Sequence, residues 1–381
     1  MNNPSPSEPH PGAKPLRRHL VVGTGSIAHA HAAAVTAHAG RAAVVTAIDI
    51  DARRAEDFAA GHGIAHWSTD LAEALVARPD LAHVCTPPGS HVPLALQCVE
   101  AGVPVLLEKP PALSLAEIDR LLEASEVNGV EVAVVFQHRF GASGLKVRQL
   151  LQEGALGRPL VAVCDTLWYR PPEYFAVPWR GKWDVEGGGP TMGHGIHQFD
   201  LLLALMGGWT EVSAMAARLS RETATEDVST ALVRFDNGAL ATLVNSLLSP
   251  RETSLLRIDT ERATVEVEHV YGYAKEDWRI TPAPGHESVG DSLAAVTGGG
   301  RSCHQDQMGA VLDALDTGSP LPVPLREARD TLELVAAVYA SAFTGRTVRK
   351  GEIGPGHPFY TRMDGTGAPW SGNLATEGAS L

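Results

Sequence analysis

Residues 19–28 read HLVVGTGSIA, an apolar run that leads into a glycine turn and then into a helix-like stretch. Gly23 permits the tight turn, Gly25 lets a pyrophosphate approach the backbone, and Ala28 lets the helix pack close to the strand. The helix N-terminus then offers free N–H groups and a positive dipole end to the phosphates. A G-x-G-x-x-A pattern is weak by itself, but its place between a strand and a helix predicts a nicotinamide dinucleotide site. The turn residues that we expect to contact the cofactor are Gly23, Gly25, Ser26 and Ile27.

The surrounding segment, residues 19–137, alternates between apolar strand-like runs and helix-like stretches. Strands separated by helices indicate a parallel sheet that is covered on both faces. The fold class is therefore α/β, with an N-terminal Rossmann dinucleotide-binding domain at 19–138. The strand-like runs are 19–22, 42–50, 81–86, 103–108 and 130–137, and the helix-like stretches are 27–39, 52–60, 71–78, 92–101 and 115–125.

The pattern changes after about residue 140, where strand-like runs follow one another. Runs 228–235 and 239–248 flank Asp236-Asn237-Gly238, and Asn-Gly between two such runs is a strong hairpin signal. Consecutive strands without helices between them indicate a mostly antiparallel sheet. We therefore predict an α+β substrate and oligomerisation domain with a large open sheet. The full division is a disordered tail at 1–18, the Rossmann domain at 19–138, the α+β domain at 139–349 and an extended tail at 350–381.

An acidic residue lies at the end of the second strand-like run. Asp49 comes 21 residues after Ala28. A carboxylate at that position accepts hydrogen bonds from the adenosine ribose hydroxyls and repels a 2′-phosphate, so it favours NAD over NADP. Arg53 and Arg54 follow closely and leave NADP open, and Arg54 is counted among the cofactor contacts. The alternative for Asp49 is a helix N-cap or a turn residue.

Composition restricts the partners. The chain of 381 residues carries a formal net charge of −13 and has no basic run, which argues against a nucleic-acid-binding protein. Four scattered cysteines without a C-x-x-C pair are typical of reduced thiols in a cytoplasm. No apolar run reaches the roughly 20 residues that a membrane helix needs. We therefore expect a cytoplasmic protein whose partner is a small molecule and neither nucleic acid nor a membrane.

The triplet Glu108-Lys109-Pro110 ends the strand-like run 103–108. In an open parallel sheet, ligands bind beyond the carboxyl ends of the strands, which places Lys109 beside the nicotinamide. An ammonium there polarises a hydroxyl or carbonyl oxygen and stabilises the negative charge that develops on it during hydride transfer. For an isolated lysine, a solvated position before a loop proline is the alternative.

Two segments resemble the Gfo/Idh/MocA family, which includes glucose–fructose oxidoreductase and inositol dehydrogenase. Residues 86–91 read TPPGSH and residues 100–110 read EAGVPVLLEKP. The resemblance extends from the glycine turn to the helix-like stretch 327–343, and its motifs are specific to the family but not to one member. It implies a Rossmann domain, a second domain whose open sheet often mediates oligomerisation, and Lys109 as the catalytic lysine. The cofactor-lining residues that it implies are Thr86, Pro87, Glu108, Gln137, Trp179 and Arg180.

A histidine-containing stretch follows a glycine run. Residues 187–200 read GGGPTMGHGIHQFD, where the family pattern is a glycine run followed by Asp-x-Gly-x-His at the start of a helix. His197 matches the histidine and takes the role of general base, since an imidazole pKa of about 6.5 suits proton transfer near neutrality. Gly193 stands where many members carry aspartate, which weakens any inference about the substrate. His194 is either a substrate contact that replaces this carboxylate or a supporting residue.

Aromatic and polar residues nearby are candidates for substrate contact. Tyr169 and Trp183 can stack on a polyol ring, although an aromatic core cluster accounts for them equally well. His91 is placed at the cofactor or else caps the helix that follows it. The series His194, His197 and Asp200 has the form H-x-x-H-x-x-D, but hydride transfer to NAD needs no metal and we expect none.

These observations predict an NAD(P)-dependent oxidoreductase that acts on a secondary alcohol of a sugar, sugar derivative or cyclitol. NAD is the expected cofactor, with NADP possible, and a homodimer or homotetramer is expected through the sheet of the second domain. One alternative is a non-catalytic NAD-sensing regulator on the same fold. Another is a glycosidase- or lyase-type member that oxidises its substrate transiently and retains NAD.

Overall fold

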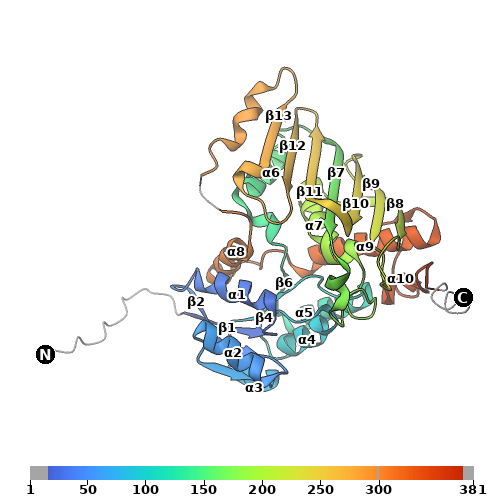
Figure 1. Cartoon of the computed structure of the whole chain (residues 1–381). Coiled ribbons are helices and arrows are strands. Elements are labelled where there is room, and N and C mark those ends of the chain that lie inside the picture. The colour runs from blue at the N-terminus through green and yellow to red at the C-terminus, as the bar shows by residue number, and fades with distance from the viewer. Residues whose placement is uncertain (1–15, 298–299, 372–381) are drawn as a thin grey trace, which may run out of the picture.

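The computed structural model describes residues 16–297 and 300–371 and contains two sheets with helices around them (Figure 1). The predicted α/β class, a Rossmann domain followed by a domain with a mostly antiparallel sheet, is confirmed. Of the predicted tail at 1–18, residues 1–15 lie outside the described residues, and Arg17 already begins the first strand. The domain boundary at 138 stays a prediction; it falls inside the helical turn Gln137–Phe140.

The first sheet has six parallel strands in the order β3-β2-β1-β4-β5-β6. β1 pairs with both β2 and β4, so the connection from β3 to β4 crosses over and leaves a crevice at the carboxyl ends of β1 and β4. The glycine turn follows β1, and Lys109 follows β5. The strands are β1 (Arg17–Val22), β2 (Ala42–Ile48), β3 (His66–Ser68), β4 (Leu81–Val84), β5 (Val105–Leu107) and β6 (Val132–Val134), and the helices are α1 (Ser26–Thr36), α2 (Ala52–His62), α3 (Leu71–Val76), α4 (His91–Glu100) and α5 (Leu115–Asn128).

Local sequence explains where these helices begin and end. At the start of α5, the Ser114 hydroxyl accepts a hydrogen bond from the Glu117 N–H, and the Glu117 carboxylate accepts one from Leu113. Such a reciprocal cap satisfies N–H groups that have no partner within the helix. Gly102, after α4, has a φ of +75°, the left-handed conformation that glycine adopts without strain.

The second sheet has eight strands in the order β13-β12-β11-β7-β10-β9-β8-β14, and all pairs except β7–β10 are antiparallel. The predicted hairpin is formed by β9 and β10, with Gly238 at a φ of +87° in its turn. The strands are β7 (Pro159–Tyr169), β8 (Trp209–Ala217), β9 (Val228–Phe235), β10 (Leu240–Ser246), β11 (Leu248–Thr260), β12 (Ala263–His269), β13 (Trp278–Pro282) and β14 (Val348–Arg349), and the helices are α6 (Ala142–Gln152), α7 (Ile196–Met206), α8 (His304–Thr317), α9 (Leu325–Thr344) and α10 (Pro358–Thr361).

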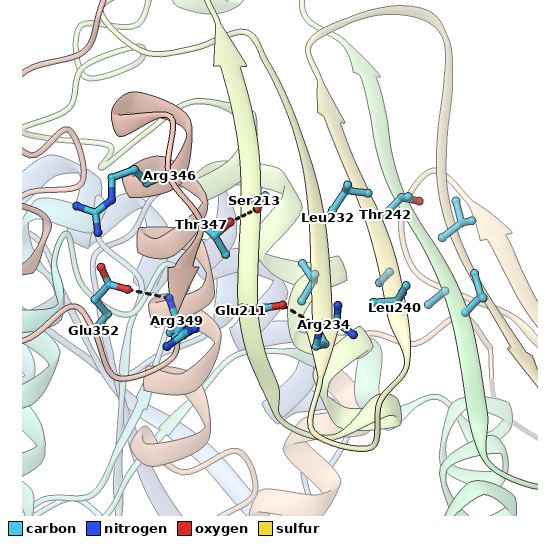
Figure 2. A pocket seen from close by; sticks show the side chains of 15 residues that line it. Glu211, Ser213, Leu232, Arg234, Leu240, Thr242, Arg346, Thr347, Arg349 and Glu352 are labelled. Atoms are coloured by element: carbon cyan, nitrogen blue, oxygen red, sulfur yellow. Dashed lines mark hydrogen bonds and ion pairs between the residues drawn. The ribbon is translucent and has the colours of Figure 1, made fainter.

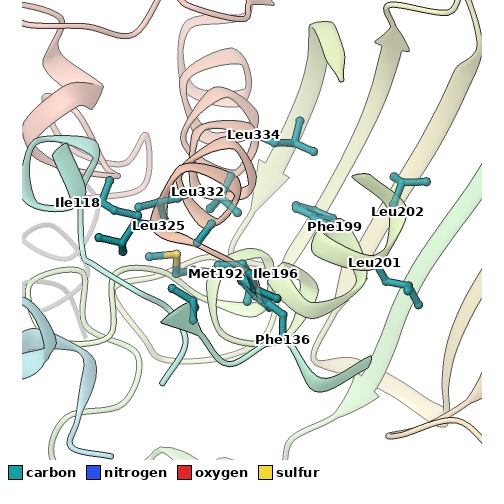
Figure 3. Close-up of a cluster of buried hydrophobic side chains, with 14 of the residues drawn as sticks. Ile118, Phe136, Met192, Ile196, Phe199, Leu201, Leu202, Leu325, Leu332 and Leu334 are labelled. Atoms are coloured by element: carbon teal, nitrogen blue, oxygen red, sulfur yellow. The ribbon is translucent and has the colours of Figure 1, made fainter. Parts of the chain in front are cut away.

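The two faces of this sheet differ. One face carries exposed apolar side chains such as Leu232 and Leu240, and no helix covers them in the described part of the chain (Figure 2). The other face is covered by α7 and α9, whose apolar side chains meet α5 in a continuous core (Figure 3). The same core therefore holds the two sheets together and fixes the position of α7 relative to the end of β5.

Two further contacts join the Rossmann domain to the second domain: an arginine paired with two carboxylates, and helix α8 packed against α1. The Arg139 guanidinium, just after β6, makes two hydrogen bonds of 2.6 Å to the buried carboxylate of Asp200 on α7 and also pairs with Glu327 on α9. The Asp200 carboxylate is thereby engaged by arginine and does not converge with His194 and His197. Helix α8 packs against α1 of the Rossmann domain.

Several elements differ from the sequence-based expectation. Strands β3, β7, β8, β13 and β14 were not predicted: β3, β13 and β14 are short, β8 has no clear apolar run, and β7 was missed although its residues 160–164 read LVAVC. Of the predicted C-terminal tail, residues 372–381 lie outside the described residues, whereas residues 350–371 contain α10 and bury Phe359 and Met363. Among residues 16–297 and 300–371, no helix is long and apolar enough to span a bilayer.

Candidate active site

The glycine turn has the geometry that a pyrophosphate needs. Gly23 has a φ of +87°, and a Cβ there would lie 2.6 Å from Cγ2 of Thr86, so only glycine fits. Gly25 is the N-cap of α1, with no side-chain cap, no acidic residue in the first turn and open space where a Cβ would point. The first N–H groups of α1 are thus available to an anion.

A cavity of about 900 Å³ extends from this turn to α7. It brings together most of the predicted cofactor and catalytic residues, although they come from six separate segments of the chain. His91, Gln137, Tyr169 and Trp183 do not line it. The predicted site residues that line the cavity are Gly23, Gly25, Ser26, Ile27, Asp49, Arg54, Thr86, Pro87, Glu108, Lys109, Trp179, Arg180, His194 and His197.

Asp49 is held in place at the rim of the cavity. Its carboxylate accepts hydrogen bonds of 2.9 Å from the N–H and the hydroxyl of Thr24 and one of 3.0 Å from the Asp51 N–H. Partial burial acts to raise its pKa, but these hydrogen bonds and Arg54 bring the pKa below its ordinary value. The group is therefore an anion at neutral pH. Asp51, and not Asp49, is the N-cap of α2.

Lys109 projects into the cavity at the end of β5, where the Lys109–Pro110 peptide bond is cis. Its Nζ donates a hydrogen bond of 3.2 Å to the carbonyl oxygen of Gly193. Burial lowers the pKa of Lys109, while the carboxylates of Glu108 and Glu186 act in the opposite direction. An ammonium has three N–H donors, so two remain for a ligand.

His197 and His194 lie on the other wall of the cavity. The turn Thr191–Gly195 is π-helical and continues directly into α7, which places both rings toward Lys109. His197 is buried, stacks on His138 with ring centroids 4.9 Å apart, and has no hydrogen-bond partner on either ring nitrogen among the described residues. Burial and the charge of Lys109 hold the pKa of His197 well below its ordinary value, so the ring is neutral and keeps one nitrogen lone pair that can accept a hydrogen bond.

A row of buried polar side chains lies behind Lys109. His19 Nδ1 is 2.9 Å from His83 Nε2, His83 Nδ1 is 2.8 Å from His31 Nδ1, and His31 Nε2 is 3.0 Å from the Glu108 carboxylate. His304 approaches the same carboxylate oxygen at 3.1 Å. Burial acts to raise the pKa of Glu108, but the hydrogen bonds from His304 and His31 hold it well below its ordinary value. The ligand atoms of Glu108, His31 and His304 lie within 4.8 Å of one another, a spacing that a metal ion could also bridge.

The predicted residues outside the cavity have other partners. His91 is buried at the start of α4 and links the carbonyl oxygens of Thr86 and Pro110 at 2.7 and 2.8 Å, so it shapes two cavity loops from behind. Gln137 hydrogen bonds to the Tyr271 hydroxyl. Tyr169 lies exposed beside Arg221, and Trp183 packs against Tyr339 and Phe343. Trp183 is therefore part of an aromatic core cluster, which was the alternative to substrate contact.

The reasoning from sequence missed several cavity residues, and three of them lie near Lys109 and the two histidines. Trp168 sits edge-on to His194 with ring centroids 4.7 Å apart, and Tyr271 lies edge-on to His197 at 5.7 Å. Glu186 also lines the cavity, directly before the glycine run. That adjacency to the family motif was an available signal for Glu186. No local pattern marks Tyr271, because a loop after β12 brings it there.

Known proteins of similar sequence and structure were compared with this chain. A D-glucoside 3-dehydrogenase of Escherichia coli is 26% identical over 363 residues, which cover 88% of this chain and 98% of that protein. A D-apiose dehydrogenase of Paraburkholderia graminis is 27% identical, covering 81% and 83%. The crystal structure of the WlbA dehydrogenase from Bordetella pertussis, in complex with NADH and UDP-GlcNAcA, is 28% identical, with a TM-score of 0.78 and coverage of 88% and 99%.

Two family models match consecutive parts of the sequence. The model described as an oxidoreductase family with an NAD-binding Rossmann fold matches residues 17–136. The GFO/IDH/MocA C-terminal domain matches residues 145–266. The two matches together span more than half of the chain, and the protein therefore belongs to the GFO/IDH/MocA family of NAD-binding oxidoreductases.

Proposed function

We propose that this oxidoreductase is an NAD-dependent dehydrogenase of a sugar, sugar derivative or cyclitol, with Lys109 and His197 as its catalytic residues. The observation that carries the proposal is the shared cavity. Lys109 and His197 line the same cavity as the glycine turn, and both ring nitrogens of His197 are buried without a partner among the described residues. Buried polar atoms are normally hydrogen bonded, so an unpartnered pair indicates a ligand position.

The proposed chemistry is the exchange between a secondary alcohol and a ketone. A bound NAD would supply the hydride acceptor for the substrate carbon, and NADH would supply the hydride for the reverse reaction. The Lys109 ammonium donates a hydrogen bond to the substrate oxygen and stabilises the negative charge that builds on it. The neutral imidazole of His197 takes the hydroxyl proton, and the imidazolium gives it back in the reverse direction. His194 is proposed to contact a neighbouring substrate hydroxyl.

The residues at the glycine turn fit an NAD molecule. The open N-terminus of α1 suits the pyrophosphate, and the anionic carboxylate of Asp49 at the rim suits the adenosine ribose hydroxyls. The substrate class rests on the relatives, whose names include a D-glucoside 3-dehydrogenase, a D-apiose dehydrogenase and inositol 2-dehydrogenases. The aromatic ring of Trp168 beside His194 is a suitable surface for the apolar face of a sugar.

A substrate screen tests this proposal. Sugars, glycosides, inositols and sugar acids are incubated with NAD and then with NADP, and NADH or NADPH absorbance is followed. Turnover of at least one of them with NAD is the expected result. Binding of NADH without turnover of any compound would instead indicate a non-catalytic, NAD-sensing regulator. Tightly retained NAD without net formation of NADH would indicate an enzyme that oxidises its substrate only transiently.

Asp49 provides the first prediction. Substitution Asp49→Ser removes the carboxylate that repels a 2′-phosphate, so the preference for NADH over NADPH should fall about tenfold or more, as expected for the loss of one charge-assisted contact and one repulsion. The dissociation constants are measured by quenching of tryptophan fluorescence.

Asp57→Ser is the matched control for Asp49→Ser, because it removes the same charge from an exposed position on α2 outside the cavity. It should leave the ratio unchanged. A wild-type protein that prefers NADPH tenfold would overturn the assignment of Asp49.

We also propose that the open face of the second sheet binds a second copy of the chain. Leu232, Leu240 and Met215 are 63%, 49% and 78% exposed on this face, and the surface beside them is hollowed (Figure 2). Large exposed apolar side chains gathered on one face are typical of protein interfaces. A homodimer or homotetramer would cover them. A cytoplasmic location is proposed on the support of the four unpaired cysteines.

The double substitution Leu232→Glu with Leu240→Glu should convert the oligomer to a 40.3 kDa monomer, because it places buried, unpaired charges in the interface. Light scattering coupled to size-exclusion chromatography measures the mass. Val76→Glu, at an exposed apolar position on α3 away from this sheet, should leave the mass unchanged. A monomeric wild-type protein contradicts the proposal.

A further inference from the structure

The site has a carboxylate that is not contributed by the histidine-containing stretch. Glu186 precedes the glycine run and is only 8% exposed, and its side chain lines the same cavity as Lys109 and His194. Its Oε2 accepts a hydrogen bond of 2.6 Å from the Gly181 N–H, and its Oε1 lies 3.4 Å from the Arg180 guanidinium. The carboxylate is therefore fixed in the cavity wall and does not reach bulk solvent.

The orientation of this carboxylate relates directly to Gly193. A Cβ built on Gly193 would meet nothing closer than Oε1 of Glu186, at 3.8 Å, which is ordinary van der Waals contact. The backbone of Gly193 is helical, so a side chain is tolerated there. The carboxylate of Glu186 thus borders the space that an aspartate side chain at position 193 would enter.

Lys109 connects the two positions. Its Nζ is held by the Gly193 carbonyl oxygen at 3.2 Å. Burial raises the pKa of Glu186, while the Gly181 N–H, Arg180 and Lys109 act to lower it, and the negative charge of Glu186 favours the ammonium form of Lys109 in return. A buried ammonium loses hydration, and a nearby anion offsets part of that loss.

We propose that Glu186 supplies, from the loop before the glycine run, the active-site carboxylate that this chain lacks at position 193. Its charge adds to that of Glu108 in favouring the ammonium form of Lys109, and its unshared oxygen lone pairs accept a hydrogen bond from a substrate hydroxyl beside the one that reacts. The inference rests on the proposed function, in which Lys109 addresses the substrate oxygen. It also points to a substrate with two adjacent hydroxyl groups.

A rescue experiment distinguishes this role from simple support of the loop. Glu186→Gln keeps the size and the hydrogen-bond acceptor toward Gly181 but removes the charge. We expect kcat/KM for the best compound of the screen to fall about 10- to 100-fold, the range lost with a hydrogen bond to a charged group. Adding Gly193→Asp to this variant should recover most of the loss, whereas the matched double variant with Gly193→Asn should not.

A second measurement needs no substrate. The chain has six lysines, so reductive methylation with ¹³C-formaldehyde followed by NMR resolves their titrations, and Lys109→Met identifies the signal of Lys109. Glu186→Gln should lower the pKa of Lys109, and the additional Gly193→Asp should raise it again. The inference is overturned if Glu186→Gln leaves this titration unchanged, or if the Asp and Asn double variants behave alike. An absence of turnover in every variant with the lysine titrations as expected would count against the proposed function alone.

Discussion

Replacing Lys109 by methionine is expected to lower kcat by about 10²- to 10³-fold, because it removes the ammonium that we propose faces the substrate oxygen while keeping the aliphatic side chain. The loss of one preorganised donor to a developing oxyanion costs about 10²- to 10³-fold, and the loss of a positioned proton-transfer group costs about 10²- to 10⁴-fold. His197→Asn should therefore produce a loss of similar size. Steady-state kinetics on the best compound of the screen measure both.

The pattern of binding and turnover separates a catalytic role from a structural one. The affinity for NADH, measured by fluorescence, should stay close to that of the wild type in both variants, because Asp49 and the glycine turn remain. Lys146→Met, on α6 outside the cavity, is the matched control and should retain full turnover. If Lys109→Met and His197→Asn both turn over at the wild-type rate, these residues are not the catalytic pair.

The second large effect is expected in the pH dependence of stability. His19 and His138 are buried, and burial lowers their pKa values to about 4 and about 3, respectively. Below pH 6.5 the unfolded chain binds protons at these positions and the folded protein does not, so the free energy of unfolding decreases as the pH falls. The loss begins near pH 6.5 and, for His19, is complete near pH 4. Each residue contributes on the order of 3 kcal/mol to this loss.

His138→Phe isolates this effect. His138 has no hydrogen-bond partner on either ring nitrogen among the described residues and is surrounded by His197, Tyr271 and Tyr273, so an uncharged aromatic ring is a close substitute. Urea unfolding at pH 7 and at pH 4.5 should show that the variant gains about 2 to 3 kcal/mol relative to the wild type on acidification.

An exposed histidine provides the comparison for this measurement. His66→Gln, in β3, should follow the wild-type curve at every pH. Parallel curves for the wild type and His138→Phe between pH 7 and pH 4.5 would show that the buried histidine does not account for the acid sensitivity.

The Rossmann half was predictable because its signals are local. A strand, a glycine turn and a helix lie within ten residues, and the helix caps at Ser114 and Gly102 depend only on their neighbours. The second sheet was harder to predict from the sequence, because β7 pairs with β10 and β11, which come more than 70 residues later. Such pairings are decided by packing between distant segments and not by composition within a window.

The aromatic pair Trp168-Tyr169 shows why part of the site was misplaced. Of these two residues the sequence analysis named only Tyr169 as a candidate for contact with a ring, but neighbouring residues of a strand point to opposite faces. Trp168 consequently faces His194 in the cavity, and Tyr169 faces outward beside Arg221. The glycine run had a similar limit: it indicated the position of the histidines, but only the folded loop shows that Glu186 lies against Gly193.

The hydrogen bonds in the buried row behind Lys109 all run in one direction, from His19 to Glu108. A carboxylate can only accept, so His31 must carry its hydrogen on Nε2, and its Nδ1 must accept from Nδ1–H of His83. Nε2 of His83 then accepts from Nδ1–H of His19. The Glu108 anion beside Lys109 thereby selects the tautomer of three rings on β1, β4 and α1. The negative charge of Glu108 at the cavity therefore orders the ring hydrogens of His31, His83 and His19 across the interior of the nucleotide-binding domain.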